Sequence, residues 1–594
     1  MNSIWNKNIS VFQKRFAALF ELFKLQINEF NKYIQTPQAQ EKLYPFWEVT
    51  KTRSDFYTAT QKGIRLHSAY NPQKEAETII QNTDFSDSET CVFLGIGLGY
   101  TCIECAKKHP NKTIIIFEPD PNHFFASLLF LDWEAVFNCK NLILAISCPP
   151  DQGITILNQF ELLKTTFFTS NALTNHAENY FDTLQTLIKR NKNKEKINNA
   201  TLEKFGKLWT KNTCANLEKS FFSQGITQYK NKGKNIPFLI LAAGPSLEKI
   251  LPILPQIKNK VVIVCVDTAL RFCIKNKVQP DFIVLTDPQF WAYKHIEGIK
   301  SPSSILITES AVYPPVFRFP CKKIICCKSN FPLEHFFDSY RKEKGTLVAG
   351  GSVASTAWNF AQYSGSTEIY MAGLDLAFPQ KQTHIKGSTF EQATHVNSKR
   401  ISTSETSHMP IIFSGNACYE KNYNNEDVLT DQRMKMFAWW FESRIEQFPN
   451  VKTYTFSKEG LYIPGIEYCS IDKLLEKKDI TEIKKAFISQ EENINATQNN
   501  FENAINTFIK EMNKIKENAL LLKQQLEKNE INSDNFFDLK NTIKDSNLKH
   551  IIKMLSPTKK QIESKNKNNT LNNRIIELTL LIQNIEYCLK KIKK

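Results

Sequence analysis

The sequence predicts an α/β protein with two Rossmann-like, doubly wound units and a C-terminal α-helical hairpin or small bundle. Short apolar segments alternate with helical segments from residue 91 to about residue 200, and again from residue 238 to about residue 375. Such alternation is typical of a parallel sheet covered by helices. After residue 500 the apolar residues instead follow heptad spacing, which predicts packed helices. Because 594 residues are too many for a single hydrophobic core, we expect three or four domains.

These changes of pattern divide the chain into four segments. Residues 1–85 hold an amphipathic helix and, between Trp47 and Leu66, the alternation of a small antiparallel β element. Residues 86–200 form the first Rossmann-like domain, residues 201–470 the central domain, and residues 471–594 the C-terminal helical domain. The helical spacing in the first segment is carried by Phe12, Phe16, Leu19, Phe20 and Phe23.

The first doubly wound unit begins with a glycine-rich turn. A short apolar strand leads to Gly95, Gly97 and Gly99, and the next strand, residues 113–117, ends at Glu118. This order resembles the nucleotide-binding turn of Rossmann and methyltransferase folds, although it lacks the full Gly-x-Gly-x-x-Gly spacing. Two interpretations stay open: a methyltransferase-like ligand site, or a Rossmann-like domain without a cofactor.

The second unit begins with a turn that suits an anion. The strand 238–241 leads to Ala243, Gly244, Pro245 and Ser246, where a helix begins. Glycine lets the backbone approach a ligand closely, proline at the first helical turn loses no hydrogen bond, and Ser246 adds a hydroxyl group. Together they predict phosphate binding at a helix N-terminus. A simple helix cap would show the same pattern.

Further polar residues follow the later strands of this unit. The carboxyl ends of parallel strands share one edge of a sheet, where ligands of doubly wound folds bind. We therefore expect a nucleotide pocket there. Its remaining candidate residues are Asp267 and Thr268 after one strand, Asp287 after the next, and Gly351 and Ser352 at the start of a helix.

A third cluster lies at residues 373–387. It places Asp375 at a strand end and His384 in a nearby polar loop. Histidine can act as a general acid or base near neutral pH, but a loop histidine is often merely exposed. His395 and His408 are competitors for the same role. The sequence contains no Asp-x-Asp motif at an expected strand end and no P-loop, so we predict no metal site and disfavour a P-loop kinase.

The net charge is +16, from 76 Lys and Arg against 60 Asp and Glu. Much of this excess lies in lysine-rich stretches, so we expect no nucleic-acid partner, although the field would attract an anionic nucleotide-sugar. The 14 cysteines lack zinc-binding spacing. The chain contains no apolar stretch of ~18–20 residues and no signal peptide. We therefore expect free thiols, no membrane span and a cytoplasmic location.

Taken together, these strings resemble the motility accessory factor (Maf) family of flagellin glycosyltransferases. The central strings are FLILAAGPSLEKILP, VVIVCVDTALRFCIKNKVQPDFIVLTDPQ and GGSVASTAWNFAQYSGSTEIYMAGLDLAF, followed by THIKG. The upstream strings are LHSAYNPQKEA, VFLGIGLGY and IIIFEPDPNHF. The resemblance covers roughly residues 40 to 470. The central part also resembles archaeal 6-hydroxymethylpterin diphosphokinase, of the MptE-like type.

The Maf resemblance implies a specific reaction. Maf enzymes transfer pseudaminic or legionaminic acid from its CMP-sugar to Ser or Thr of flagellin, a step needed for flagellum assembly and motility. Their central domain is similar to a sialyltransferase fold, a GT-A-type variant. The resemblance implies that residues 243–246 contact CMP, that Asp267, Thr268 and Asp287 line the nucleotide pocket, and that His384 is the base, with no metal or other cofactor. Sialyltransferases often carry Asn where this chain has Ala243.

Four questions remain open. Asp375 can orient the histidine or the acceptor, or it can cap a loop. Diphosphate transfer from ATP to a pterin is a rival activity, and flagellin binding by a non-enzymatic, chaperone-like protein is another. The C-terminal heptads predict either an arm for docking or self-association, or a helical cap on the catalytic domain.

Overall fold

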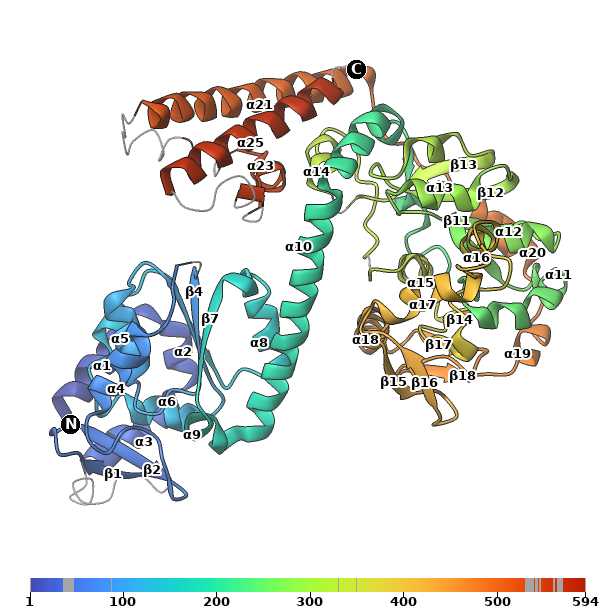
Figure 1. Ribbon diagram of the computed structural model, residues 1–594. Helices are drawn as coiled ribbons and strands as arrows, with labels where there is room; N and C mark the ends of the chain where they lie inside the picture. The colour runs from blue at the N-terminus through green and yellow to red at the C-terminus, as the bar shows by residue number, and fades with distance from the viewer. Residues whose placement is uncertain are drawn as a thin grey trace. The chain divides into compact units, whose positions relative to one another are not determined.

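The computed structural model describes the 594 residues except 1, 36–46, 87, 330, 349, 529–538, 540–542, 544–545, 559–560, 563–569 and 593–594 (Figure 1). The chain divides into two compact units, Met1–Ala200 and Thr201–Lys594. Each unit has its own hydrophobic core, and each is described below by itself.

The first unit opens with helices and a small antiparallel sheet. The segment predicted as one amphipathic helix is broken at Phe16 and Phe23, giving α1 (Asn2–Arg15), α2 (Ala17–Leu22) and α3 (Lys24–Ile34). Phe12 is fully buried, with its ring 5.8 Å from that of Phe125. Strands β1 (Glu48–Lys51), β2 (Tyr57–Gln61) and β3 (Ile64–Arg65) then pair antiparallel.

A parallel sheet with strand order β6-β5-β4-β7 forms the centre of this unit. Its central strand β4 is buried along its whole length, which explains its continuous apolar sequence. The strands are β4 (Thr90–Leu94), β5 (Thr113–Glu118), β6 (Leu142–Ile146) and β7 (Thr165–Thr169). The helices include α4 (Pro72–Gln81), α5 (Tyr100–Lys108), α6 (Pro121–Ser127), α7 (Glu134–Phe137), α8 (Pro150–Leu157), α9 (Asn171–Thr174) and the 3-10 turn η3 (Asn175–Ala177).

The helix α10 (Glu178–Phe221) is 44 residues long. Its last turns are fixed to the second unit by buried amide side chains. Asn212 donates to the carbonyls of Pro288 and Ala311 at 2.9 and 3.0 Å, and Asn216 donates to those of Ser310 and Val312, both at 2.8 Å. These bonds satisfy carbonyl groups that buried loops would otherwise leave unpaired.

Nine described strands form the sheet of the second unit, in the order β18-β17-β14-β9-β10-β11-β12-β13-β8. Each pair of neighbours in it is parallel, so the predicted fold class is confirmed. The strands are β8 (Gln224–Gly225), β9 (Phe238–Leu241), β10 (Val262–Val266), β11 (Phe282–Val284), β12 (Ser301–Thr308), β13 (Cys321–Cys326), β14 (Glu368–Ala372), β17 (Lys452–Thr455) and β18 (Ile466–Tyr468).

The strand order reverses beside β9. From β9 the chain adds β10 to β13 on one side, and it later places β14 on the other. Such a switch point leaves a crevice at the carboxyl ends of the two diverging strands, and ligands of doubly wound folds bind there. The candidate residues after β9 and β14 therefore lie at the position that the topology favours.

Helices and a β-hairpin surround this sheet. Helix α15 is almost entirely buried, and the indole N–H of its Trp358 donates to Thr453 Oγ1 on β17 at 3.0 Å. The elements used below are η5 (Pro245–Lys249), α12 (Asp267–Lys275), α13 (Phe290–Ile296), α14 (Pro332–Asp338), α15 (Val353–Tyr363), α16 (Thr389–Val396), α17 (Ser404–Phe413) and α18 (Gln432–Gln447). Also present are η6 (Leu251–Ile253), α11 (Leu254–Ile257), β15 (Cys418–Lys421), β16 (Asp427–Thr430), α19 (Asp472–Leu475) and α20 (Thr481–Ile488).

The predicted C-terminal helical hairpin is present. Helices α21 (Gln498–Glu527) and α25 (Thr570–Ile592) lie side by side, with α23 (Lys549–Leu555) against them (Figure 1). The heptad seam of α21 is buried within this chain, and its Phe508 ring lies 5.3 Å from that of Phe337 on α14. The seam thus joins the hairpin to α14 within the second unit.

Candidate functional site

The turn after β9 is closed by a carboxylate of the protein itself. Ser246 N–H donates to Asp375 Oδ2 at 2.9 Å, and Gly244 N–H donates to the Gly373 carbonyl at 2.9 Å. A Cβ atom on Gly244 would lie 2.4 Å from Asp375 Oδ2 and 2.5 Å from the Gly373 carbonyl oxygen. We expected the glycine to admit a ligand phosphate. The structure corrects that explanation, because the glycine makes room for Asp375 and the backbone of the β14 turn.

Asp375 is 2% exposed. Burial raises the pKa of its carboxyl group, and the hydrogen bond from Ser246 opposes the shift. Its Oδ1 atom is buried and has no hydrogen-bond partner among the described residues. Of the predicted alternatives, the structure shows the loop cap. An unpaired buried oxygen is costly, so it is also a position where a ligand hydroxyl would be favoured.

Two more carboxyl groups follow β10 and β11. Asp267, the first residue of α12, is 3% exposed, and Thr268 follows it. Burial raises the Asp267 pKa to about 7, against a backbone hydrogen bond from Thr268, and the charge of Asp287 adds to the increase. Asp287 accepts a hydrogen bond from Gln289 N at 2.8 Å, and burial raises its pKa as well. The structure therefore brings these two predicted residues into electrostatic contact.

The loop that carries His384 is bonded directly to the β9 turn. Ile385 N–H donates to the Ala243 carbonyl at 2.9 Å. The His384 ring lies 4.9 Å from the ring of Phe390, and its Nδ1 is 3.2 Å from Thr383 Oγ1. Burial, followed by the charges of Arg433 and His408, lowers the His384 pKa to about 4. The imidazole is therefore neutral at pH 7.

A second histidine, His295, lies beside this loop and is absent from the sequence prediction. Its ring is 4.8 Å from Phe390, so Phe390 contacts both imidazoles, and its Nδ1 is hydrogen-bonded with Thr389 Oγ1. Burial, then the charges of His384 and Arg271, lowers the His295 pKa to about 4. Its only sequence signal is its place on the helix that follows Asp287.

Two other predicted histidines differ from His384 in their surroundings. His408 on α17 is hydrogen-bonded through Nδ1 to the Ser404 carbonyl at 2.8 Å, and its charge acts on His384. His395 on α16 is exposed. Arg433, which the sequence analysis also missed, contributes a cation at this edge, with its side chain 57% exposed. His384 is thus the member of the predicted set whose pKa is lowered.

Gly351 and Ser352 form the start of α15. Ser352 Oγ accepts from Ala354 N–H at 3.3 Å, as an N-cap. Gly351 has φ +85°, and a Cβ there would lie 2.5 Å from the Phe437 ring on α18. These contacts tie the pair to α15 and α18. The interactions of the described residues do not connect it to the aspartates or to His384.

The glycine turn of the first unit is filled by the protein's own groups. Cβ atoms on Gly95, Gly97 and Gly99 would lie 2.5 Å from Leu173 O, 2.5 Å from His67 Nε2 and 2.4 Å from the Trp133 ring. All three glycines have positive φ. Internal packing therefore accounts for them without a cofactor. Glu118, at the end of β5, pairs with His176 at 2.7 Å.

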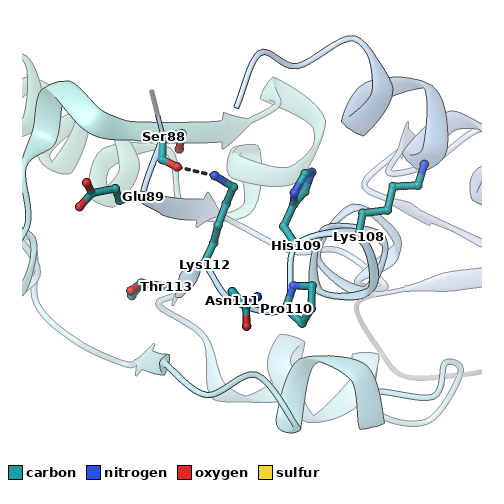
Figure 2. Close-up of a pocket in the computed structure, with 8 residues that line it drawn as sticks. All are labelled: Ser88, Glu89, Lys108, His109, Pro110, Asn111, Lys112 and Thr113. Carbon is teal, nitrogen blue, oxygen red and sulfur yellow. Dashed lines mark hydrogen bonds between the residues drawn. The ribbon is translucent and has the colours of Figure 1, made fainter. Parts of the chain in front are cut away.

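Figure 2 shows a pocket at the opposite edge of the first sheet, where β4 and β5 begin. Lys112 is turned toward Ser88 and donates to its carbonyl, and it also donates to the Phe85 carbonyl at 3.3 Å. Doubly wound sheets bind ligands at the other edge, so this pocket is not the candidate site. It is lined by Ser88, Glu89, Lys108, His109, Pro110, Asn111, Lys112 and Thr113.

Comparison with known families agrees with both halves of the chain. The sequence profile of the glycosyltransferase Maf N-terminal domain matches residues 28–141. That of the 6-hydroxymethylpterin diphosphokinase MptE-like family matches residues 211–381, which contain the β9 turn and Asp375. The resemblance to the Maf family, and that of the central part to MptE-like proteins, are therefore confirmed.

A solved structure has a fold similar to that of this chain. A solved Maf glycosyltransferase from Magnetospirillum magneticum AMB-1 superposes over 100% of this chain and 91% of its own, with a TM-score of 0.60 and 14% identity. At that identity the likeness concerns the fold. Together with the domain matches, it makes this chain similar to a Maf glycosyltransferase in domain content and fold.

Curated relatives come from Treponema pallidum (strain Nichols) and are described as uncharacterized proteins. One is 33% identical to this chain, and the match covers 32% of this chain and 56% of the relative. Another is 27% identical, and the match covers 42% of this chain and 87% of the relative. A third is 28% identical, and the match covers 41% of this chain and 49% of the relative. The chain thus spans little more than half of the first of these relatives. Within the described part of the chain, none of the helices has the length and apolar content that crossing a bilayer requires.

Proposed function

We propose that this chain transfers a nonulosonic acid of the pseudaminic or legionaminic type from its CMP-sugar to Ser or Thr of flagellin, in the cytoplasm. The transfer would serve flagellum assembly and motility. One observation supports this most: four neighbouring strands, β14, β9, β10 and β11, bring their polar carboxyl ends to one edge in a chain with the Maf fold. The bond from Ile385 to Ala243 adds the His384 loop to that edge.

The carboxyl groups of this edge suit an anionic donor because burial raises the pKa of Asp267, Asp287 and Asp375, which favours their neutral forms. A pKa of about 7 keeps Asp267 about half protonated at neutral pH. A protonated Asp267 can donate to a phosphate oxygen, whereas an ionised one would repel it. Arg433 supplies positive charge beside His384, and the free Oδ1 of Asp375 can pair with a sugar hydroxyl.

His384 is the proposed base. As the acceptor hydroxyl attacks the anomeric carbon, the bond from that carbon to the CMP oxygen breaks and the hydroxyl proton passes to the imidazole. A pKa of about 4 makes His384 a weak base, so the proton moves late, when the new bond has made the hydroxyl acidic. With Nδ1 facing Thr383, Nε2 is the ring atom left for the acceptor. We propose no metal ion or other cofactor for this step.

The intact mass of flagellin tests this proposal. Flagellin from a strain without this gene should lose the mass of one or more nonulosonic acid units relative to its parent, and the size of the loss identifies the sugar. Restoring the gene should restore the mass. An unchanged flagellin mass in the deletion strain would contradict the proposed acceptor.

A matched pair of variants tests the role of His384. His384→Gln should reduce transfer by about 10²–10⁴-fold, the usual contribution of a general base. Its affinity for the CMP-sugar should change little. His395→Gln, which alters an exposed histidine of the neighbouring helix, should retain full activity. Full turnover by His384→Gln would move the base elsewhere, with His295 tested next.

The match to the MptE-like family over residues 211–381 supports a second candidate. That candidate is diphosphate transfer from ATP to the hydroxyl of 6-hydroxymethylpterin, which normally needs Mg²⁺. Incubating the purified chain with ATP, Mg²⁺ and the pterin separates the two activities. Pterin diphosphate formation, together with an unchanged flagellin mass, would establish this candidate in place of the transferase.

The non-enzymatic candidate, a flagellin-binding chaperone-like protein that self-associates through its C-terminal helices, makes a different prediction. A Gly244→Asp/His384→Ala double variant would then still bind flagellin and support wild-type motility. The seam of α21 is buried within the chain, so self-association would have to use other surfaces of the hairpin.

A further inference from the structure

A buried cluster of metal-binding side chains lies at the carboxyl edge of the first sheet. Glu118 is the last residue of β5, His123 lies on α6, and His176 lies on η3 after β7. Since β5, β4 and β7 are parallel neighbours, these segments leave the sheet at the same edge. This is the edge where doubly wound folds hold ligands.

We propose that Glu118, His123 and His176 bind a divalent transition-metal ion of the zinc type. One ligand atom from each residue lies within 4.8 Å of the other two. Two imidazoles and one carboxylate are the ligand set of a zinc site with one open coordination position. Tetrahedral zinc ligands lie about 3.4 Å apart. Glu118 Oε1 and His176 Nε2 are 2.7 Å apart and would separate slightly, and no other distance in the cluster would need to shorten by more than about 1.4 Å.

Burial makes a compensating cation favourable here. Glu118 is 1% exposed and His123 is 5% exposed, and the His176 side chain is 7% exposed. Asp120 adds a second carboxylate, 3.0 Å from His123 Nδ1. The Asp120 side chain is 39% exposed, so the buried carboxyl group of this cluster is that of Glu118. A cation beside it would be favourable, because a buried carboxylate without a nearby cation is costly.

The outer contacts orient the ligands as metal sites require. His123 Nδ1 lies 3.0 Å from Asp120 Oδ2, and the other ring nitrogen, Nε2, faces the Gln61 side-chain amide at 2.8 Å. A carboxylate on the far nitrogen of a ligating histidine is the usual arrangement around zinc. Asp120 N–H also donates to Glu118 Oε1 at 3.2 Å. The same residue thus orients two of the proposed ligands.

The absence of a side chain at Gly95 allows the segment that carries His176 to pack close to the end of β4. The backbone of Leu173, three positions before His176, hydrogen-bonds with the imidazole. A Cβ on Gly95 would lie 2.5 Å from the Leu173 carbonyl oxygen. The glycine turn therefore lets the segment with His176 pack against the end of β4. No short sequence motif indicates this cluster, because Glu118 and His176 lie 58 positions apart.

The full-length chain, freed of metal with a chelator, should bind one equivalent of Zn²⁺ in a calorimetric titration. With Co²⁺ as the probe, the visible spectrum should show a site without thiolate ligands, which distinguishes it from the 14 free cysteines. X-ray absorption of the zinc form should show only N and O neighbours, at about 2.0–2.1 Å. A sulfur shell, or no stoichiometric binding by the wild-type chain, would overturn the proposal.

Variants assign the site to these residues. Glu118→Gln, His123→Gln and His176→Gln should each lose the one-equivalent binding. Asp120→Asn should weaken it by about 10–100-fold, as changes beside a ligating histidine do. The control His109→Gln changes a histidine of the same unit in the pocket of Figure 2 and should bind normally. Binding that survives in all three ligand variants, each folded by circular dichroism, would place the ion elsewhere.

Discussion

Gly244 is a position of the site that leaves no room for a larger side chain. Its φ of −70° is open to any residue, so the restriction is steric and comes from Asp375 and the Gly373 carbonyl. A local sequence pattern cannot contain that information, since Ser246 and Asp375, which close the turn, are 129 positions apart. The glycine marks the contact between two strand ends on either side of the switch point.

Gly244→Ala should therefore destabilise the second unit by about 1–3 kcal/mol, the usual cost of inserting a methyl group into a filled space. The thermal midpoint of the purified chain would report it. Gly298→Ala is a suitable control, because Gly298 has φ +74° and a Cβ added there would meet nothing within 4 Å. The Gly298→Ala variant should lose only about 1 kcal/mol of stability, the cost of holding a residue other than glycine at a positive φ. Equal effects of the two changes would contradict the steric explanation.

Asp267 predicts a dependence of stability on pH. Burial raises its pKa from 3.8 to about 7 in the folded protein. The folded state keeps a proton that the unfolded state releases, so stability is fully present below pH 3.8 and is lost as pH rises toward 7. The Asp267→Asn variant has no carboxyl group at this position, so its stability does not fall in this way as the pH rises. Relative to wild type it should gain about 2–4 kcal/mol between pH 4 and pH 8.

Thermal unfolding of both proteins across that pH range would measure the difference. A stability difference that stays constant with pH would show that Asp267 does not hold the proton. The buried histidines change wild type and variant alike, so they cancel in this comparison.

At the scale of elements, the apolar strands were the most predictable part. Strands β4, β9 and β10 have continuous apolar sequences because both faces of the sheet are covered. Their carboxyl ends, and hence most of the candidate site, followed from the parallel topology. The breaks at Phe16 and Phe23 did not, because neither residue carries a turn signal and tertiary packing decides them. His295 was missed because a single helical histidine has no distinguishing pattern.

One buried ion-pair network joins several elements of the second unit. Lys344 is 1% exposed and is paired with Glu334 on α14 and, at 2.9 Å, with Asp338. Glu334 also accepts from Ser220 at the end of α10, at 2.5 Å, and from Ser310 after β12, at 2.6 Å. These bonds hold α10, α14 and the β12 end together.

Lys344→Met should lower stability by about 3–5 kcal/mol, because it leaves two buried carboxylates without a cation. The thermal midpoint should fall by about 5 °C or more. Adding Glu334→Gln should recover part of this loss, since the largest uncompensated charge is then removed. Lys485→Met is the control. Lys485 pairs with Glu482, and their side chains are 68% and 84% exposed, so this variant should lose less than about 1 kcal/mol of stability. A Lys344→Met/Glu334→Gln double variant that is less stable than Lys344→Met alone would contradict this account.

The whole molecule consists of two units with separate cores, joined along the chain by α10. Calorimetry should therefore show two unfolding transitions. Phe124→Ala removes a fully buried ring from the first core, and Ile240→Ala removes a fully buried side chain from the second. Phe124→Ala should lower the free energy of unfolding of the first unit by about 3–5 kcal/mol, and Ile240→Ala should lower that of the second unit by about 2–5 kcal/mol. Each variant should leave the transition of the other unit unchanged. A single transition that responds to both changes would show that the units unfold together.

The order of strands in the second sheet also has a consequence for the synthesis of the chain. Strand β9, whose sequence is FLIL, is made early, and its neighbour β14 follows more than 120 residues later, at residues 368–372. Until then one edge of β9 has no partner, and unpaired apolar edges are where growing chains associate wrongly. A ribosome that stalls before residue 368 should therefore release a fragment that aggregates, and cells that make this protein are expected to rely on chaperones during that interval.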